Sequence, residues 1–159
     1  PDCRRLSSMK WTKGVESLNQ FSDGFPLLVL SSSALDDLNA RLNADGKPPV
    51  GIERFRPNIV LAGMEAHDED RMDEMHIQTG DDTREAVLRL VKPCKRCPIP
   101  DIDPATSLSN HDVSDALQGY RQNTLMDGAV TFGMNAIVIT GVDEVLRVGQ
   151  RVSADFSFQ

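Results

Sequence analysis

Long apolar runs, abundant cysteine and an excess of basic residues are all missing from this sequence. No apolar run approaches the roughly 18 residues that a membrane helix requires, and the N-terminal stretch is polar, so we expect neither a transmembrane helix nor a signal peptide. Three cysteines do not suggest the disulfide framework of a secreted protein, which makes the expected compartment cytoplasmic. A net charge of −7 argues against a nucleic-acid or anionic-membrane surface, so neither is expected as a partner.

The composition that remains is typical of one globular domain. A chain of 159 residues can bury a core without disulfide or metal staples, and 40% hydrophobic and 26% charged residues are ordinary proportions. There are no internal repeats. The chain starts at Pro1 without an initiator methionine, which is expected of a fragment of a longer protein or of a processed chain.

Most of the elements that the sequence predicts are strands. A continuous apolar run over 24–31 predicts a buried strand, and 54–63 predicts a second one with an edge or an end at Pro57. Residues 75–94 have the pattern of a hairpin that turns at 80–82. Residues 128–156 predict two or three strands with turns at Gly141 and Gly149.

Two helices interrupt these strands. The first is expected over 32–46, capped by Ser32 or Ser33 and ended by Gly46, with one apolar face made of Leu35, Leu38 and Leu42. The second is expected within 111–123, with its cap near Asp112. Between the first helix and the hairpin, the acidic run 65–74 reads as a solvated loop. Strands with short helices between them predict an α+β, predominantly β domain of curved, barrel-like form.

The chemistry of the chain centres on a cysteine pair, Cys94 and Cys97, in "VKPCKRCPIPDID". A closed zinc site would need four paired ligands, and the remaining Cys3, His67, His76 and His111 are scattered. A thioredoxin-like pair would precede a helix, whereas the Pro-Ile-Pro sequence after Cys97 predicts extended backbone. Two readings stay open: a single thiolate that binds a soft metal together with a cofactor, and two cysteines that simply pack.

Several separated motifs, in order, resemble the MOSC domain, the C-terminal domain of molybdenum cofactor sulfurases. They are "FSDGFPLLVLSSSALDDLN", "RFRPNIVLAG", "VKPCKRC" with "DIDPAT", "YR", "FGMN" and "LRVGQRV". The resemblance is strongest to the branch that contains the mitochondrial amidoxime reducing component and bacterial hydroxylamine-reducing relatives. It implies a MOSC-type β-barrel with short helices over residues 20–159, with 1–19 as an N-terminal remnant or partial strand.

The resemblance also implies a cofactor and the residues that hold it. The cofactor would be the molybdenum cofactor, a molybdenum–pterin dithiolene, with Cys97 as the ligand to the metal and the catalytic residue. The positions that match pterin contacts are Asp23, Gly24, Arg56, Asn58 and Asn135. Lys95 and Arg96 add positive charge that suits an anionic pterin and favours the thiolate form that binds metals.

The same resemblance gives two readings of function. In the first, the chain is the metal-holding part of an oxidoreductase that reduces N-hydroxylated substrates, with electrons from a separate flavin or iron–sulfur protein, because no cysteine after Cys97 could hold a cluster. In the second, the chain is a carrier of sulfur, as a persulfide, or of cofactor, without turnover. Relatives in this branch also hold the cofactor through a "PVKS"-like segment, which 7–11 does not match, so we expect this chain to present part of the cofactor site.

Overall fold

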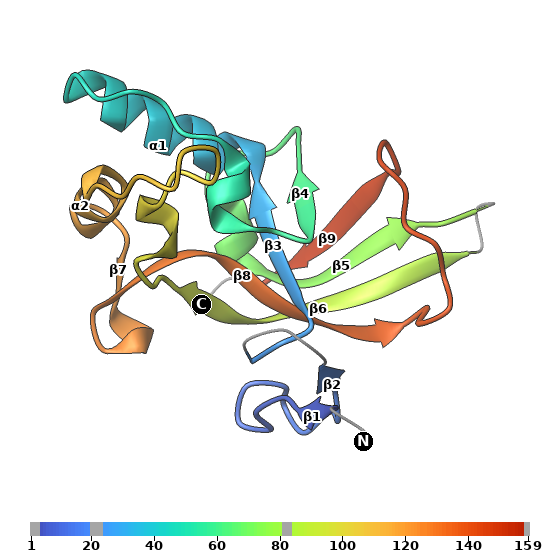
Figure 1. The fold of residues 1–159 in the computed structure, drawn as a ribbon. Helices are drawn as coiled ribbons and strands as arrows, with labels where there is room; N and C mark the ends of the chain where they lie inside the picture. Colours follow the sequence, from blue (N-terminus) through green and yellow to red (C-terminus); the bar gives the residue numbers. More distant parts are fainter. Residues whose placement is uncertain (1–3, 20–23, 81–83, 158–159) are drawn as a thin grey trace. The chain divides into compact units, whose positions relative to one another are not determined.

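The computed structural model describes residues 4–19, 24–80 and 84–157, and the statements below refer to these residues. They form two compact units. The first contains Pro1–Leu27, Glu69–Lys92 and Asn135–Gln159, and the second contains Leu28–Asp68 and Pro93–Met134. Two long strands, β6 (Glu85–Lys95) and β8 (Ala129–Thr140), pass from one unit into the other (Figure 1).

The main sheet has the strand order β4-β3-β8-β6-β5-β9, and a short strand, β7, pairs with β8. Strands predominate, and the helices are short. The prediction of an α+β, mostly β fold with a barrel-like sheet is therefore confirmed. The hairpin that the sequence predicts is also confirmed by the antiparallel pairing of β5 with β6, and positions 81 and 82 of the turn expected at 80–82 lie outside the described residues.

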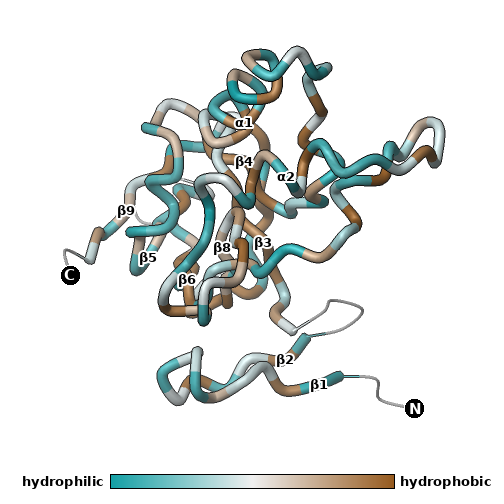
Figure 2. The backbone as a smooth tube through the Cα atoms, turned by 90° about the vertical axis from the view of Figure 1, so that its left-hand side faces the viewer, coloured by the Kyte–Doolittle hydropathy of each residue, from teal (hydrophilic) through white to brown (hydrophobic). Residues whose placement is uncertain are grey.

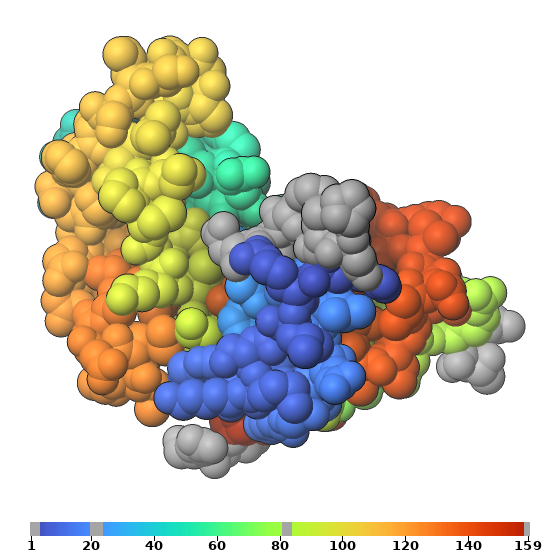
Figure 3. All heavy atoms as spheres, turned by 60° about the horizontal axis from the view of Figure 1, so that its bottom comes forward, coloured from blue at the N-terminus to red at the C-terminus, as the bar shows by residue number. Residues whose placement is uncertain are grey.

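In the first unit, β5 (Met72–Gln78) pairs antiparallel with β6 and with β9 (Val152–Phe156). Alternate side chains of β5, Met75 and Ile77, are buried, because successive residues of a strand point to opposite faces. Two short strands, β1 (Arg5–Leu6) and β2 (Leu18–Asn19), form a separate antiparallel pair. The segment that carries them lies at the surface and is blue in Figure 3.

In the second unit, β3 (Leu27–Ser31) pairs in parallel with β4 (Ile59–Leu61) and continues directly into α1 (Ser32–Ala44). Strand β3 is hydrophobic up to its last residue, Ser31, whereas α1 contains both polar and apolar residues along its length (Figure 2). Helix α2 (Asp112–Gln118) follows a long exposed loop, and β7 (Gln122–Asn123) leads into β8. The core of this unit consists of buried side chains from these elements: Leu30, Ala34, Leu38, Leu42, Phe55, Val113, Leu117 and Phe132.

Four 3-10 helices connect these elements: η1 (Ile52–Phe55), η2 (Asp68–Arg71), η3 (Ile99–Asp101) and η4 (Thr124–Met126). None of the helices in the described ranges is long and apolar enough to span a membrane.

Three local predictions differ from the structure. The cap of α1 is Ser31, whose hydroxyl accepts a hydrogen bond from the Ala34 N–H at 3.1 Å, rather than Ser32 or Ser33. The strand predicted over 54–63 is a strand only from Ile59, because the chain before Pro57 turns as η1. The acidic run is not a solvated loop, since it forms η2 and the start of β5, and Glu69 is fully buried.

Candidate functional site

Cys97 lies in the second unit, just beyond the end of β6, with its side chain exposed, while Cys94 is half-buried within the strand. Both are free thiols. The sequence predicted extended backbone for the Pro-Ile-Pro segment after Cys97, but the structure forms a helical turn there. Pro98 has φ −67° and ψ −5°, and the Asp101 N–H donates to its carbonyl at 3.0 Å, because the φ angle of proline suits the start of a helical turn. The turn η3 therefore follows an accessible thiol.

Arg96 makes its polar contacts with the protein itself. Its Nη2 donates to the Phe55 carbonyl at 3.3 Å, and its Nη1 donates to the Phe132 carbonyl at 3.4 Å and to the Cys94 sulfur at 3.1 Å. Its guanidinium also lies 5.3 Å from the centre of the Phe55 ring. Arg96 therefore anchors the end of β6, and its charge lies against Cys94. The expectation that Arg96 adds positive charge to a cofactor site stays a prediction, and Arg96 and Cys97 line the same pocket.

A second arginine, Arg54, holds the segment after Cys97. Its guanidinium donates to the Pro100 carbonyl at 3.3 Å and to the Asp103 carboxylate at 3.2 Å, and its side chain is 12% exposed. The other oxygen of Asp103 accepts the Ala105 N–H at 2.8 Å, and "DIDPAT" forms a turn at this point. Sequence reasoning missed Arg54, although a second arginine two residues before Arg56 was a visible signal.

The remaining predicted residues of this unit lie on neighbouring backbone. Arg56 is exposed and ends η1 in the left-handed region, with φ 54°, so it does not lie on a strand end as expected. Asn58 joins β3 to β4: its Oδ1 accepts the Leu28 N–H at 2.8 Å, and its own N–H donates to the Leu28 carbonyl at 2.9 Å. Lys95 is exposed.

Two of the other predicted cofactor residues belong to the first unit. Gly24 is exposed, and its carbonyl accepts a hydrogen bond from the Asn19 side chain at 3.1 Å. Asn135 lies on β8, and its side chain donates to the Lys92 carbonyl at 3.2 Å. Asp23 lies outside the described residues.

A pocket of about 250 Å³ lies beside Cys97, within the second unit. Its walls come from the segment that follows β6, from α2 and from β8. The lining residues are Arg96, Cys97, Pro98, Pro100, Asp101, His111, Val113, Ser114, Leu117, Gln118 and Val130. The loop between η3 and α2 is exposed over most of its length and is yellow to gold in Figure 3.

Asp101 and His111 place titratable groups in this pocket. Asp101 is 2% exposed, and its Oδ1 accepts the Ser114 N–H at 2.9 Å. Its Oδ2 lies 3.7 Å from Nδ1 of His111, whose side chain is 82% exposed. The N-cap position of α2 is His111, next to Asp112 as the sequence predicts, and Asp101 adds an acceptor for the Ser114 N–H of the first turn. Sequence reasoning assigned no role to His111, because no sequence pattern links positions 101 and 111.

A partly buried polar cluster in the same unit surrounds Tyr120. Burial, followed by the charge of Asp37, raises the pKa of Tyr120 to about 12. Burial also acts to raise the pKa of Asp37, but hydrogen bonds and charge from Arg41 and His67 outweigh it, so that this pKa lies below its ordinary value. The Arg41 guanidinium lies 3.8 Å from the centre of the Tyr120 ring. This cluster stabilises the packing of α1.

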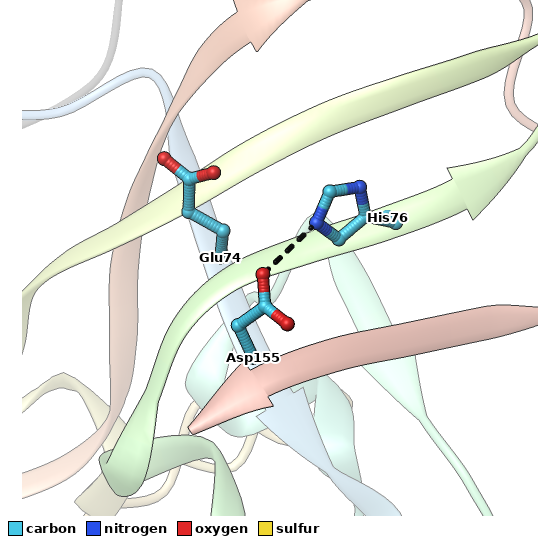
Figure 4. Close-up of side chains that lie close together, drawn as sticks. All are labelled: Glu74, His76 and Asp155. Carbon is cyan, nitrogen blue, oxygen red and sulfur yellow. Dashed lines mark hydrogen bonds and ion pairs between the residues drawn. The ribbon is translucent and has the colours of Figure 1, made fainter. Parts of the chain in front are cut away.

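In the first unit, Glu74, His76 and Asp155 gather on adjacent strands β5 and β9 (Figure 4). His76 Nε2 lies 3.4 Å from Asp155, its Nδ1 lies 3.3 Å from Glu85, and Glu74 accepts hydrogen bonds from Arg89 at 2.6 and 2.9 Å. A divalent cation would have to compete with Arg89 for Glu74. We therefore describe this group as an ion-pair network on the sheet.

The chain is similar to a known domain family and to several known proteins. The MOSC domain family model matches residues 17–153. Mitochondrial amidoxime-reducing component 1 of Homo sapiens is 39% identical over 103 residues, which cover 64% of this chain and 28% of that protein. Mitochondrial amidoxime reducing component 2 of Rattus norvegicus is 35% identical over 120 residues, which cover 72% of this chain and 32% of that protein. The aligned region thus spans about a third or less of these relatives. Since the family model covers most of the chain, this protein belongs to the MOSC domain family.

Proposed function

We propose that this chain is the metal-holding part of an oxidoreductase that reduces N-hydroxylated substrates. Cys97 would be the protein ligand to the metal of a molybdenum–pterin dithiolene cofactor, which supplies the two-electron chemistry when bound. The similarity to amidoxime-reducing components supports the choice of reaction. Electrons would come from a separate flavin or iron–sulfur protein.

The observation that carries this proposal is a set of hydrogen bonds that hold the segment of Arg56 beside the segment of Cys97. The Phe55 carbonyl, which precedes Arg56, accepts a hydrogen bond from Arg96, which precedes Cys97. Arg54 makes a second link between the same segments through Pro100 and Asp103. An exposed thiol and an exposed guanidinium are therefore held on backbone that is fixed from within the unit.

The residues of this unit suit the proposed cofactor. A thiolate ligand must be accessible, and the Cys97 side chain is exposed. An anionic pterin is matched by Arg56 and Lys95, whose side chains are both exposed. Arg96 would contribute indirectly by fixing the backbone beside the ligand. The alternative of a sulfur or cofactor carrier would use the same Cys97, and the described residues provide no observation that favours it over reduction.

The test is turnover by the chain purified from cells that make the cofactor. An amidoxime such as benzamidoxime is supplied with a reduced viologen dye as electron donor, and formation of the amidine is measured for wild type, Cys97→Ala and Cys94→Ala. We expect turnover by wild type and by Cys94→Ala, and its loss in Cys97→Ala. Molybdenum-loaded wild type that forms no amidine would contradict the proposal. Isolation with an added sulfur atom on Cys97 and without molybdenum would support the carrier.

A further inference from the structure

The pocket beside Cys97 has a largely apolar interior. Val113 and Leu117 of α2 are 0% and 1% exposed, and Val130 of β8, Pro98 and Pro100 complete the apolar lining. At about 250 Å³ it is smaller than the roughly 300–1,000 Å³ typical of sites for drug-sized ligands. Its size and lining suit a small apolar group, such as one aromatic ring, beside the exposed thiol.

The polar groups of the pocket select against anions. The buried Asp101 carboxylate faces the space together with Ser114, His111 and Gln118. The one guanidinium in the lining, that of Arg96, donates through its two Nη atoms to Phe55, Phe132 and Cys94, and its Nε is buried without a hydrogen-bond partner among the described residues. A ligand that is neutral or weakly basic would therefore be preferred over a carboxylate of the same shape.

We propose that this pocket holds the apolar body of a small, neutral or weakly basic N-hydroxylated substrate, and that His111 donates a proton to the departing hydroxyl group. The assignment rests on the proposed function, because it places the N–O bond of the substrate near Cys97. Asp101 is the positioning residue: its Oδ2 lies 3.7 Å from Nδ1 of His111, while its Oδ1 is held by the Ser114 N–H.

The proposed reaction balances in atoms and in electrons. An amidoxime takes up two electrons and two protons, and it yields an amidine and water as the N–O bond breaks. The bound cofactor would supply the two electrons, which the separate electron-donor protein would replace. One proton passes from a ring nitrogen of His111 to the hydroxyl oxygen, which leaves as water, and the other comes from solvent and stays on nitrogen. His111 is then protonated again from solvent, to which 82% of its side chain is exposed.

Binding can be tested on the chain without cofactor, independently of turnover. Benzamidoxime and benzamidine are titrated while the methyl NMR signals of Val113, Leu117 and Val130 are recorded, and benzoate serves as the anionic control. We expect both nitrogen compounds to shift these signals and benzoate to leave them unchanged. Gln118→Trp, at an exposed lining position, should abolish the shifts, whereas Asp115→Trp, on the same helix outside the lining, should preserve them. Shifts that survive Gln118→Trp, or equal binding of benzoate, would overturn the pocket assignment.

The role of His111 is tested on the molybdenum-loaded chain. We expect His111→Gln to lower turnover about 100-fold while benzamidoxime still binds in the NMR titration, since general acids typically contribute 10²–10⁴-fold. Added imidazole should restore part of the turnover of His111→Gly. Asp101→Asn, which keeps the acceptor for Ser114, should lower turnover less than His111→Gln. Turnover by His111→Gln at the wild-type rate would overturn the proton-donor role. If molybdenum-loaded wild type gives no turnover, the proposed function is wrong. The binding titration still shows whether the pocket binds benzamidoxime.

Discussion

The Phe55 carbonyl lies 3.3 Å from Nη2 of Arg96, and this hydrogen bond joins the residue before Arg56 to the residue before Cys97. Two segments that are about forty positions apart in the sequence are thereby held together in one unit. Hydrogen bonds from a charged donor to backbone carbonyls are stronger than those between neutral groups. Arg96 thus fixes backbone geometry beside the proposed ligand, and Arg56 and Lys95 remain exposed for an anionic group.

The neighbouring arginines Arg54 and Arg56 should have separable effects. Arg54→Gln removes a charged donor that is 12% exposed and leaves the Pro100 carbonyl and Asp103 without it, so we expect a loss of about 1–3 kcal/mol in the free energy of unfolding. Arg56→Gln alters an exposed side chain and should change stability by less than about 0.5 kcal/mol. Urea denaturation of both variants measures the difference. Equal destabilisation by the two variants would contradict the structural role of Arg54.

Gly133 on β8 is predicted to be required for close contact with β3. Its φ is +77°, and a Cβ atom there would lie 2.8 Å from the Val29 carbonyl oxygen. Gly128 has the same φ but open space around it, so Gly128→Ala is a matched control for backbone strain. We expect Gly128→Ala to cost about 1 kcal/mol and Gly133→Ala about 1–3 kcal/mol more, measured by thermal or urea unfolding. Equal costs would show that the contact with β3 is absent.

Tyr120 should lose its proton at a higher pH than an exposed tyrosine does. It is the only tyrosine in the sequence, so the absorbance of phenolate reports it alone. Burial and the charge of Asp37 raise its pKa to about 12 from 10.0. Between these two values the unfolded chain loses the proton and the folded chain keeps it, so stability should fall as pH rises through this interval. A folded-state titration midpoint near 10.0 would contradict the burial of the phenol.

Asp37 should stabilise the fold only while it is ionised. Its pKa lies below the ordinary 3.8, because hydrogen bonds and charge from Arg41 and His67 outweigh the effect of burial. A carboxylate with a lowered folded pKa contributes stability above its unfolded pKa, and that contribution is lost as pH falls through the folded value. Asp37→Asn should therefore cost about 1 kcal/mol at neutral pH and progressively less below pH 3.8. A cost that stays constant over this range in urea denaturation would contradict the role of charge.

The elements that the sequence predicted correctly are those with strong local patterns. The β5–β6 hairpin follows from apolar residues at alternate positions of the sequence on the strand after the turn, and α1 follows from Leu38 and Leu42 on one face with Gly46 at φ +71° after its end. These features depend on neighbours within a few residues, which a sequence displays directly.

The features that the sequence did not reveal depend on contacts between distant positions. Nothing in the local sequence distinguishes Arg54 from other arginines, because its partners Pro100 and Asp103 are distant in the sequence. His111 gains its context from Asp101, whose burial follows from the packing of η3 and α2. Arg96 was assigned to the cofactor by its place in the motif, but its direction depends on where the Phe55 and Phe132 carbonyls lie.

The central claim is that Cys97 binds molybdenum, and metal content tests it most directly. Wild type, Cys97→Ala and Cys94→Ala are purified from cofactor-competent cells, and molybdenum and pterin fluorescence are measured per chain, with circular dichroism to verify folding. The account predicts near-equal molybdenum and pterin in wild type, retention in Cys94→Ala and loss in folded Cys97→Ala. Full molybdenum occupancy in Cys97→Ala would contradict the assignment of Cys97 as the ligand.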